Sequence, residues 1–111
     1  MPVLATIRLR RDYLAANKGR RAVTSGFILL VQPRGDSDEL IRAGYTVTKK
    51  IGGAVVRNRM KRRLRALARQ LLPQAGTPGA DHVLIGREGG IERDFAELRR
   101  DLERALAKAQ R

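Results

Sequence analysis

The sequence predicts an α+β fold in which a small sheet packs against helices. An uninterrupted apolar run at 27–31 is typical of a strand that is covered on both faces. Two later segments repeat apolar residues at intervals of three and four, as amphipathic helices do. Between and around them the pattern gives the order helix, strands, helix, strand, helix. A chain of 111 residues suits one modest core, so we expect a single domain, 1–111.

The N-terminal part predicts a short helix and then a strand. The helix covers about 11–18, because Asp12 lies near its start and Gly19 is a typical stop. The strand covers about 23–32 and contains the apolar run. The next segment, Pro33 followed by RGDSDE, indicates a turn.

A second strand is expected at about 40–50. In its later part Tyr45 and Val47 alternate with Thr46 and Thr48, which gives one apolar face and one polar face. Continued alternation places Lys50 on the polar face. We interpret Tyr45 as a core residue.

A long helix follows at about 55–72, and Pro73 is expected to end it. Its apolar stripe consists of Val56, Met60, Leu64, Leu67 and Leu71. A third strand is expected at 81–87, and a last helix after the pair Gly89-Gly90. The buried stripe of that helix consists of Phe95, Leu98, Leu102 and Ala105 or Leu106.

The positive charge is concentrated in one part of the chain. The formal net charge is +13, and residues 40–80 contain ten basic residues and no acidic one. Residues 81–111 contain seven of each sign. A basic excess confined to one contiguous third of a chain indicates a polyanionic partner, and nucleic acid is the leading candidate.

The long helix carries charges that work against its own stability. Seven of the thirteen residues 57–69 are Arg or Lys. Like charges four residues apart cost about 0.2–0.5 kcal/mol per pair. Arg57 and Arg59 also place cations at the helix N-terminus, where they oppose the macrodipole. The last helix shows the opposite pattern, with Glu92 and Asp94 near its start and Lys108 near its end. We therefore expect phosphates to complete the surface of the long helix.

Other chemistries find little support in the sequence. There is no Cys and a single His, which excludes disulfides and offers no His/Cys cluster for a metal. His82 follows Asp81 in a strand, so the two side chains point to opposite faces and we interpret His82 as structural. We expect no catalytic residue and no metal site in this chain. No apolar stretch is long enough for a membrane span, and we expect a cytoplasmic protein.

The segment 44–65 reads GYTVTKKIGGAVVRNRMKRRLR. It resembles the signature of the protein subunit of bacterial ribonuclease P, and six of its residues match the family's helix motif directly: Arg57, Asn58, Arg59, Lys61, Arg62 and Arg65. The flanking segments 10–30 and 81–106 are similar to the family's first helix and strand and to its last strand and helix. Three positions depart from the family pattern, namely Gly53, Asn17 and Leu30.

The resemblance implies a fold and a function. The fold is a four-stranded sheet with three helices in the order αβββαβα, with a left-handed βαβ crossover (ribosomal protein S5 domain 2-like). The function is that of the RNA-binding component of an enzyme that removes the 5′ leader of precursor tRNA. In that family the RNA performs the chemistry with bound Mg²⁺, and no obligate protein partner is needed.

The resemblance also implies two sets of site residues. The catalytic RNA would contact Arg57, Asn58, Arg59, Lys61, Arg62, Arg65 and Arg69. The leader of the precursor tRNA would lie in a cleft between the sheet and the first helix, against Tyr13, Thr46, Thr48, Lys49 and Lys50.

Two alternatives share the same charge pattern. A structural RNA-binding protein of ribosomal type would have the same fold class but no use for a leader cleft. A basic amphipathic helix could instead bind an anionic membrane. That would require its apolar stripe to face lipid, although the stripe is needed for the core.

Overall fold

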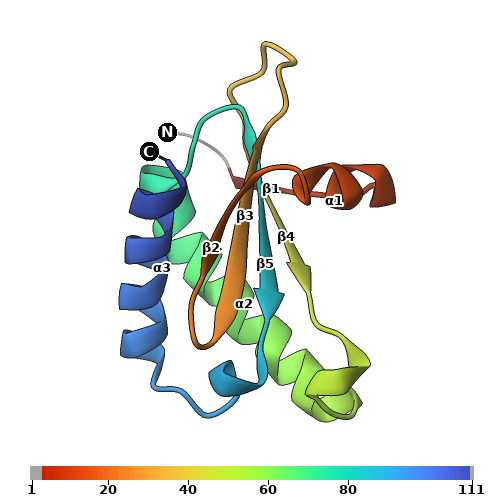
Figure 1. The fold of residues 1–111 in the computed structure, drawn as a ribbon, viewed down its shortest axis with the longest axis vertical. Helices are drawn as coiled ribbons and strands as arrows, with labels where there is room; N and C mark the ends of the chain where they lie inside the picture. Colours follow the sequence, from red (N-terminus) through yellow and green to blue (C-terminus); the bar gives the residue numbers. More distant parts are fainter. Residues whose placement is uncertain (1–3, 111) are drawn as a thin grey trace.

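The computed structural model describes residues 4–110 and confirms the α+β class (Figure 1). One mixed five-stranded sheet packs with three helices. The elements are β1 (Leu4–Thr6), α1 (Arg10–Ala16), β2 (Arg20–Val23), β3 (Phe27–Pro33), β4 (Ile41–Thr46), α2 (Ala54–Ala75), β5 (Ala80–Gly86) and α3 (Phe95–Ala109). Short 3-10 turns, η1 (Lys49–Ile51) and η2 (Glu88–Gly90), follow β4 and β5.

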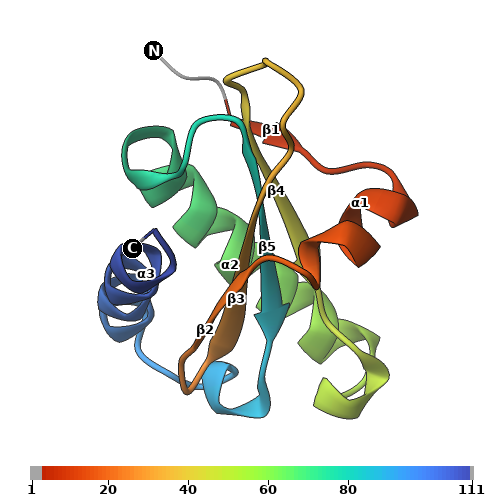
Figure 2. The same ribbon diagram turned by 45° about the horizontal axis from the view of Figure 1, so that its top comes forward.

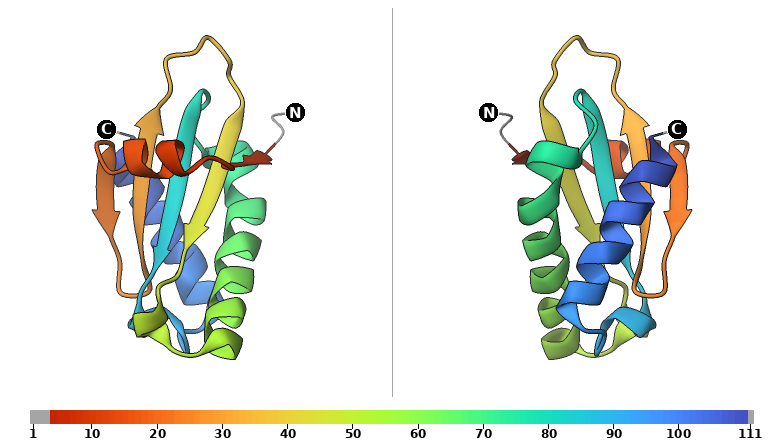
Figure 3. Two further views of the ribbon diagram at one scale, coloured as in Figure 1. Left: turned by 90° about the vertical axis from the view of Figure 1, so that its right-hand side faces the viewer. Right: turned by 90° about the vertical axis from the view of Figure 1, so that its left-hand side faces the viewer.

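The strand order in the sheet is β1-β4-β5-β3-β2. β4 is parallel to both β1 and β5, whereas β3 is antiparallel to β5 and to β2. The parallel pair β4 and β5 is connected through α2, which is the predicted βαβ unit. Figure 2 shows α1 and α3 on opposite sides of the strands, and Figure 3 shows α2 on the same side as α3.

The prediction of four strands is wrong by one, because β1 was not foreseen. β1 has only three residues and pairs with Ile41–Ala43 of β4. The strand predicted at 23–32 begins later, at Phe27, because residues 24–26 form the turn between β2 and β3. β2 ends at Val23, and the chain turns where the Thr24 hydroxyl and backbone N–H both donate to the Phe27 carbonyl oxygen, at 2.8 and 2.9 Å.

The strand predicted at 40–50 ends at Thr46. The chain then tightens into η1, where the Ile51 N–H donates to the Thr48 carbonyl at 3.1 Å. Strand alternation therefore does not reach Lys50, and its predicted place on the polar face of the strand is wrong.

α2 continues beyond the predicted stop at Pro73, to Ala75. A proline has no N–H to donate to the carbonyl four residues earlier, but only two residues of the helix follow Pro73. The Gly76 N–H donates to the Leu72 carbonyl at 2.8 Å, so the hydrogen-bond ladder resumes after the proline. The predicted stripe is buried from Met60 onward, while Val56 is half-buried.

The sheet has a hydrophobic core on each face. The larger core lies between the sheet and the helices α2 and α3, and includes Phe27, Leu64, Leu84 and Leu102. The smaller core lies under α1 and consists of Ile7, Ala16, Leu30 and Val83. Leu30 is thus covered by α1, which explains why an aliphatic side chain fits at this position.

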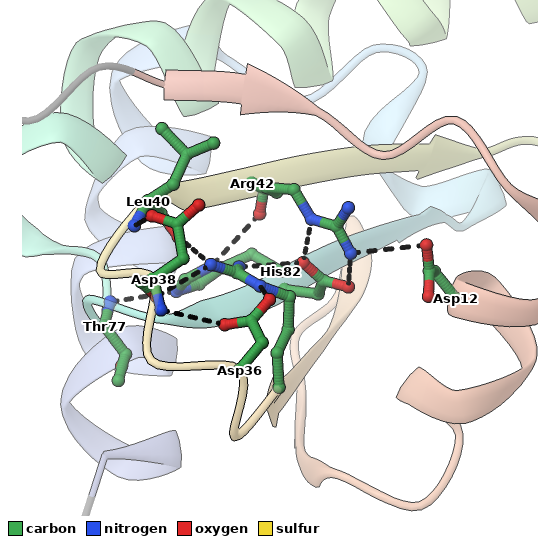
Figure 4. Close-up of polar contacts among 9 residues, drawn as sticks. Asp12, Asp36, Asp38, Leu40, Arg42, Thr77 and His82 are labelled. Carbon is green, nitrogen blue, oxygen red and sulfur yellow. Dashed lines mark hydrogen bonds and ion pairs between the residues drawn. The ribbon is translucent and has the colours of Figure 1, made fainter.

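An ion network fastens α1 to the sheet (Figure 4). The nearly buried Asp81 carboxylate on β5 accepts two hydrogen bonds of 2.6 Å from Arg42 of β4 and one of 3.2 Å from Arg34. Arg42 also lies 3.3 Å from Asp12 on α1. The hydrogen bond to Asp81 raises the pKa of Arg42, so the guanidinium stays charged.

His82 is structural, as predicted. Its side chain is fully buried, and its Nε2 accepts a hydrogen bond of 3.0 Å from the Thr77 N–H, just after α2. Because Nε2 accepts, Nδ1 must carry the proton, and it donates to the Arg42 carbonyl at 3.2 Å. Burial lowers the pKa of His82, which favours this neutral form.

Candidate nucleic-acid interface

The basic side chains of α2 form two rows. The first row faces β4 and β1. It consists of residues at intervals of four: Arg57, Lys61, Arg65 and Arg69. The guanidinium of Arg65 lies 5.7 Å from the centroid of the Tyr45 ring, within the range of a cation–π contact. Arg65 and Arg69 also line a hollow of about 150 Å³ beside Leu4–Thr6.

The second row faces the segment that precedes α3. Arg63 donates a hydrogen bond to the Arg93 carbonyl. Arg59 lies 3.7 Å from Glu92, and both side chains are exposed, so this ion pair contributes little. Asn58 and Arg62 are exposed between the rows. The surface of α2 therefore stays strongly cationic.

The start of α2 has an open set of backbone donors. Its first turn contains no acidic residue, and Gly53 provides no side-chain cap. The first N–H groups of a helix have no partner within the helix and favour an anion. The departure at Gly53 leaves these groups without an Asn side chain.

An open groove of about 520 Å³ joins α2 to α1 across the end of β4. Two tyrosines, three cations and three smaller side chains line it: Arg8, Arg10, Tyr13, Leu14, Tyr45, Thr46, Val47 and Lys61. Tyr13 is half-buried, and its hydroxyl donates to the Ile7 carbonyl at 3.4 Å. The ring lies against Gly44, where a β-carbon would be only 2.6 Å from it.

The groove is open because β1 is short. The register of β1 with β4 ends at Thr6 and Ala43, followed by one hydrogen bond from the Ile7 N–H to the Ala43 carbonyl. Beyond Ala43 the outer edge of β4 has no neighbouring strand within residues 4–110. Tyr45 therefore lies at the boundary between core and groove. Burial raises its pKa, so the phenol is neutral at physiological pH.

The predicted leader residues fall into two places. Tyr13 and Thr46 both line the groove. Thr48, Lys49 and Lys50 are exposed at η1, between β4 and α2, and do not line it. The prediction missed Arg8 and Arg10, although cations just before the first helix could have indicated them. Tyr45 packs against the larger core, as predicted, but it also lines the groove, which the prediction missed.

Known proteins of one family match this chain along nearly its whole length. A family model described as Ribonuclease P matches residues 1–110. The chain belongs to the ribonuclease P protein family. It is the protein subunit of a ribonucleoprotein endonuclease of tRNA processing.

Curated relatives and solved structures agree with this assignment. The ribonuclease P protein component of Erythrobacter litoralis is 58% identical over 96% of this chain and 86% of its own length. That of Ruegeria pomeroyi is 45% identical over 95% and 86%. Among solved structures, the RNase P protein of Thermotoga maritima has a TM-score of 0.76 at 31% identity, covering 91% of this chain and 94% of its own.

Two searches bear on other classes of protein. Within residues 4–110, no group of three or more His, Asp or Glu side chains is arranged to hold a metal ion. In the same part of the chain, no helix is long and apolar enough to cross a membrane.

Proposed function

We propose that the basic surface of α2 binds the catalytic RNA of ribonuclease P, and that the groove beside Tyr13 binds the 5′ leader of precursor tRNA. The protein then assists endonucleolytic removal of the leader to give the mature 5′ end. Mg²⁺, held mainly by the RNA, supplies the hydrolytic chemistry. The observation that carries the proposal is one continuous surface: Lys61 belongs to the basic row of α2 and also lines the groove.

The groove fits single-stranded RNA better than duplex RNA. Single strands bind where a cationic track lies beside aromatic rings on which bases stack. Here Arg8, Arg10 and Lys61 surround Tyr13, which lies on a helix that the Asp12–Arg42 ion pair fastens to the sheet. A duplex would need a wider, flatter surface.

General acid–base catalysis by the protein has little support in the described residues. His82 is buried and both of its ring nitrogens are engaged in hydrogen bonds. The buried carboxylates Asp81 and Asp101 are held by arginines. These groups are occupied in holding the fold, which fits a protein whose RNA partner performs the reaction.

We also infer that residues 1–111 act as one domain, in the cytoplasm and without an obligate protein partner. Two cores that share a single sheet support one domain. The β4–α2–β5 connection is proposed to have the left-handed sense that the family resemblance implies, and the views in Figure 3 support it.

Reconstitution tests the overall function. The purified protein is expected to leave precursor tRNA intact, and addition of the cognate catalytic RNA should give leader removal. The protein should matter most at low Mg²⁺, where cations of the protein can best replace metal ions in screening phosphates. Robust cleavage by highly purified protein alone would sink the proposal.

Substitution of Tyr13 tests the groove. One base–aromatic stack is worth about 1–3 kcal/mol, so Tyr13→Ala should weaken precursor tRNA binding by about tenfold or more. Binding of mature tRNA, and assembly with the catalytic RNA, should stay nearly unchanged. Leu9→Ala is the matched control, because Leu9 is 48% exposed on the same segment but lies outside the groove.

The result also separates this function from the ribosomal alternative. A structural RNA-binding protein would show no difference between precursor and mature tRNA. If Tyr13→Ala lowers both affinities equally, or unfolds the domain, the groove does not bind the leader.

A further inference from the structure

A second group of cations lies at the edge of the sheet that is remote from α2. Lys18, Arg20 and Arg21 lie on β2 and the loop that leads into it. Arg104 and Lys108 of α3 line a hollow of about 340 Å³ beside β2. All five side chains are exposed. We call this set the β2 edge surface.

The β2 edge surface is not neutralised by the protein. Within residues 4–110, four of its side chains form no ion pair: Lys18, Arg20, Arg21 and Lys108. The one acidic residue in the hollow, Asp101, is only 4% exposed. Its carboxylate accepts hydrogen bonds of 2.7 Å from Arg93 and 2.6 Å from Arg104. Asp101 therefore orients two guanidinium groups and leaves the outer cations unbalanced.

Protection of an exposed strand explains only part of this charge. β2 is an edge strand, and charged side chains on an edge discourage pairing with another molecule. That role accounts for Arg20 and Arg21. It does not account for Lys18 in the loop, or for Arg104 and Lys108 on a helix.

The two cationic surfaces lie at opposite edges of the sheet. β1 and β2 are its two edges, and four strand spacings of about 4.8 Å place them roughly 19 Å apart. Figure 3 shows α2 beside β4 and β1, whereas β2 and α3 lie at the other edge. A ligand on α2 must therefore cross α3, which lies on the same face of the sheet, to reach the β2 edge surface.

We propose that the β2 edge surface is a second RNA-binding surface, which contacts backbone phosphates of an RNA segment distinct from those bound by α2 and by the groove. This inference rests on the proposed function, because it takes the partner to be RNA. The phosphates belong either to the catalytic RNA or to the precursor tRNA. In both cases the protein links two RNA segments at opposite edges of its sheet.

A charge reversal tests the proposal and keeps the strand edge charged. The variant Arg20→Glu/Arg21→Glu retains protection against edge pairing, so it should stay monomeric with unchanged thermal unfolding. RNA affinity should fall by about tenfold or more, and the log–log salt slope should become shallower by roughly 1.5, as for the loss of two phosphate contacts. Arg99→Glu/Arg100→Glu on α3 is the matched control. Those arginines face Gln70, Glu103 and Glu97 instead.

Two binding arms identify the source of the phosphates. A loss with catalytic RNA alone assigns the surface to that RNA. A loss that appears only when precursor tRNA binds the reconstituted enzyme assigns it to the substrate. Equal effects of the two double variants in every arm would overturn the proposal. If Arg59→Ala/Arg62→Ala on α2 also had no effect, the proposed function itself would fail.

Site-directed crosslinking gives an independent readout. The chain has no Cys, so a single introduced Cys can carry a photoreactive group at one chosen position. Arg21→Cys should crosslink to RNA at nucleotides different from those reached by Arg62→Cys on α2. Arg100→Cys should give a low yield. A yield at position 21 no higher than at position 100 would contradict the proposal.

Discussion

The two long helices of the protein lie on the same face of the sheet, but their charges are arranged in opposite ways. α2 has no acidic residue along its 22 residues. α3 has Glu97 in its first turn and Lys108 in its last, which matches the helix dipole. It also forms the ion pairs Glu97–Arg100 and Asp101–Arg104, at 2.9 and 2.6 Å.

The difference shows what each helix surface is for. α3 pairs Arg99, Arg100 and Arg104 with its own carboxylates, so most of its charges are balanced within the folded protein. α2 is held by its buried stripe from Met60 to Leu72, and its outer surface repels itself. A bound polyanion would remove that repulsion, which fits the proposed role of α2 in binding RNA.

The largest expected effect separates the two helices by RNA binding. Arg59→Ala/Arg62→Ala on α2 should weaken assembly with the catalytic RNA by roughly 100-fold, since hydrogen bonds to charged groups are worth about 1.5–3 kcal/mol each. Arg99→Ala/Arg100→Ala on α3 should change it less than about threefold, as surface ion pairs contribute little. Filter-binding titrations at several salt concentrations measure both. Equal losses would mean that only bulk charge matters.

The second prediction compares the two helices by their contribution to stability, and here the substitution on α3 is expected to have the larger effect. Asp101→Asn should lower the free energy of unfolding by about 2 kcal/mol, because it leaves Arg93 and Arg104 without their shared partner. The value is below that of a fully buried pair, since the two arginines are 30% and 70% exposed. Arg59→Ala/Arg62→Ala should cost less than about 0.5 kcal/mol. Urea unfolding of the free proteins measures both changes in the free energy of unfolding. A larger loss for Arg59→Ala/Arg62→Ala than for Asp101→Asn would contradict the comparison.

Asp101 also gives this stability a pH dependence. Burial alone would raise the pKa of the carboxyl, but Arg93 and Arg104 lower it below its usual value. A depressed carboxyl pKa stabilises the fold above the unfolded value of about 3.9, and the contribution is lost as pH falls below it. The effect of Asp101→Asn should therefore be full at pH 7 and shrink at pH 3.

A third prediction concerns the end of α2, which His82 connects to the sheet. Burial lowers the pKa of His82 below its unfolded value of about 6.5, so the unfolded chain binds the proton more readily. Stability should therefore fall as the pH is lowered from 7.5 to 5.5. Protonation also removes the Nε2 lone pair that accepts from Thr77. His82→Gln should show a flatter profile in urea unfolding over this range. An equally steep profile would exclude His82 as the cause.

The smallest expected effect is on the response to simple anions. Sulfate should stabilise the wild-type protein by about 0.5 kcal/mol more than chloride at matched ionic strength, because it binds the folded state selectively. Sulfate also strengthens apolar burial in general, so the control is Arg59→Ala/Arg62→Ala. The variant should gain less in melting temperature than the wild type. Identical gains would mean that relief of charge repulsion on α2 is negligible.

Long periodic elements were predictable from the sequence, and short ones were not. The stripe of α2 and the apolar run of β3 carry enough repeats to fix their type. β1 has three residues and no periodicity, and it becomes a strand only through its pairing with β4. α2 passes Pro73 and ends before Gly76, a second typical stop, so the choice between the two stops could not be made from the sequence.

The candidate site likewise has one part that could be predicted from the sequence and one part that could not. The cations of α2 are contiguous in the chain, so composition alone indicated them. The groove joins residues from three separate segments, and its position depends on where β1 stops. Arg8, Arg10 and Tyr45 could be placed beside Tyr13 only once the fold was known.

Gly44 and Tyr13 are distant in the chain, but because they are in contact, the residue at one position limits which residue fits at the other. Any side chain at position 44 would overlap the Tyr13 ring and force it out toward the groove. If alanine replaced Gly44, either a smaller residue would be needed in place of Tyr13 or the groove would become narrower. The width of the groove therefore depends on the absence of a side chain at position 44, a buried position of β4.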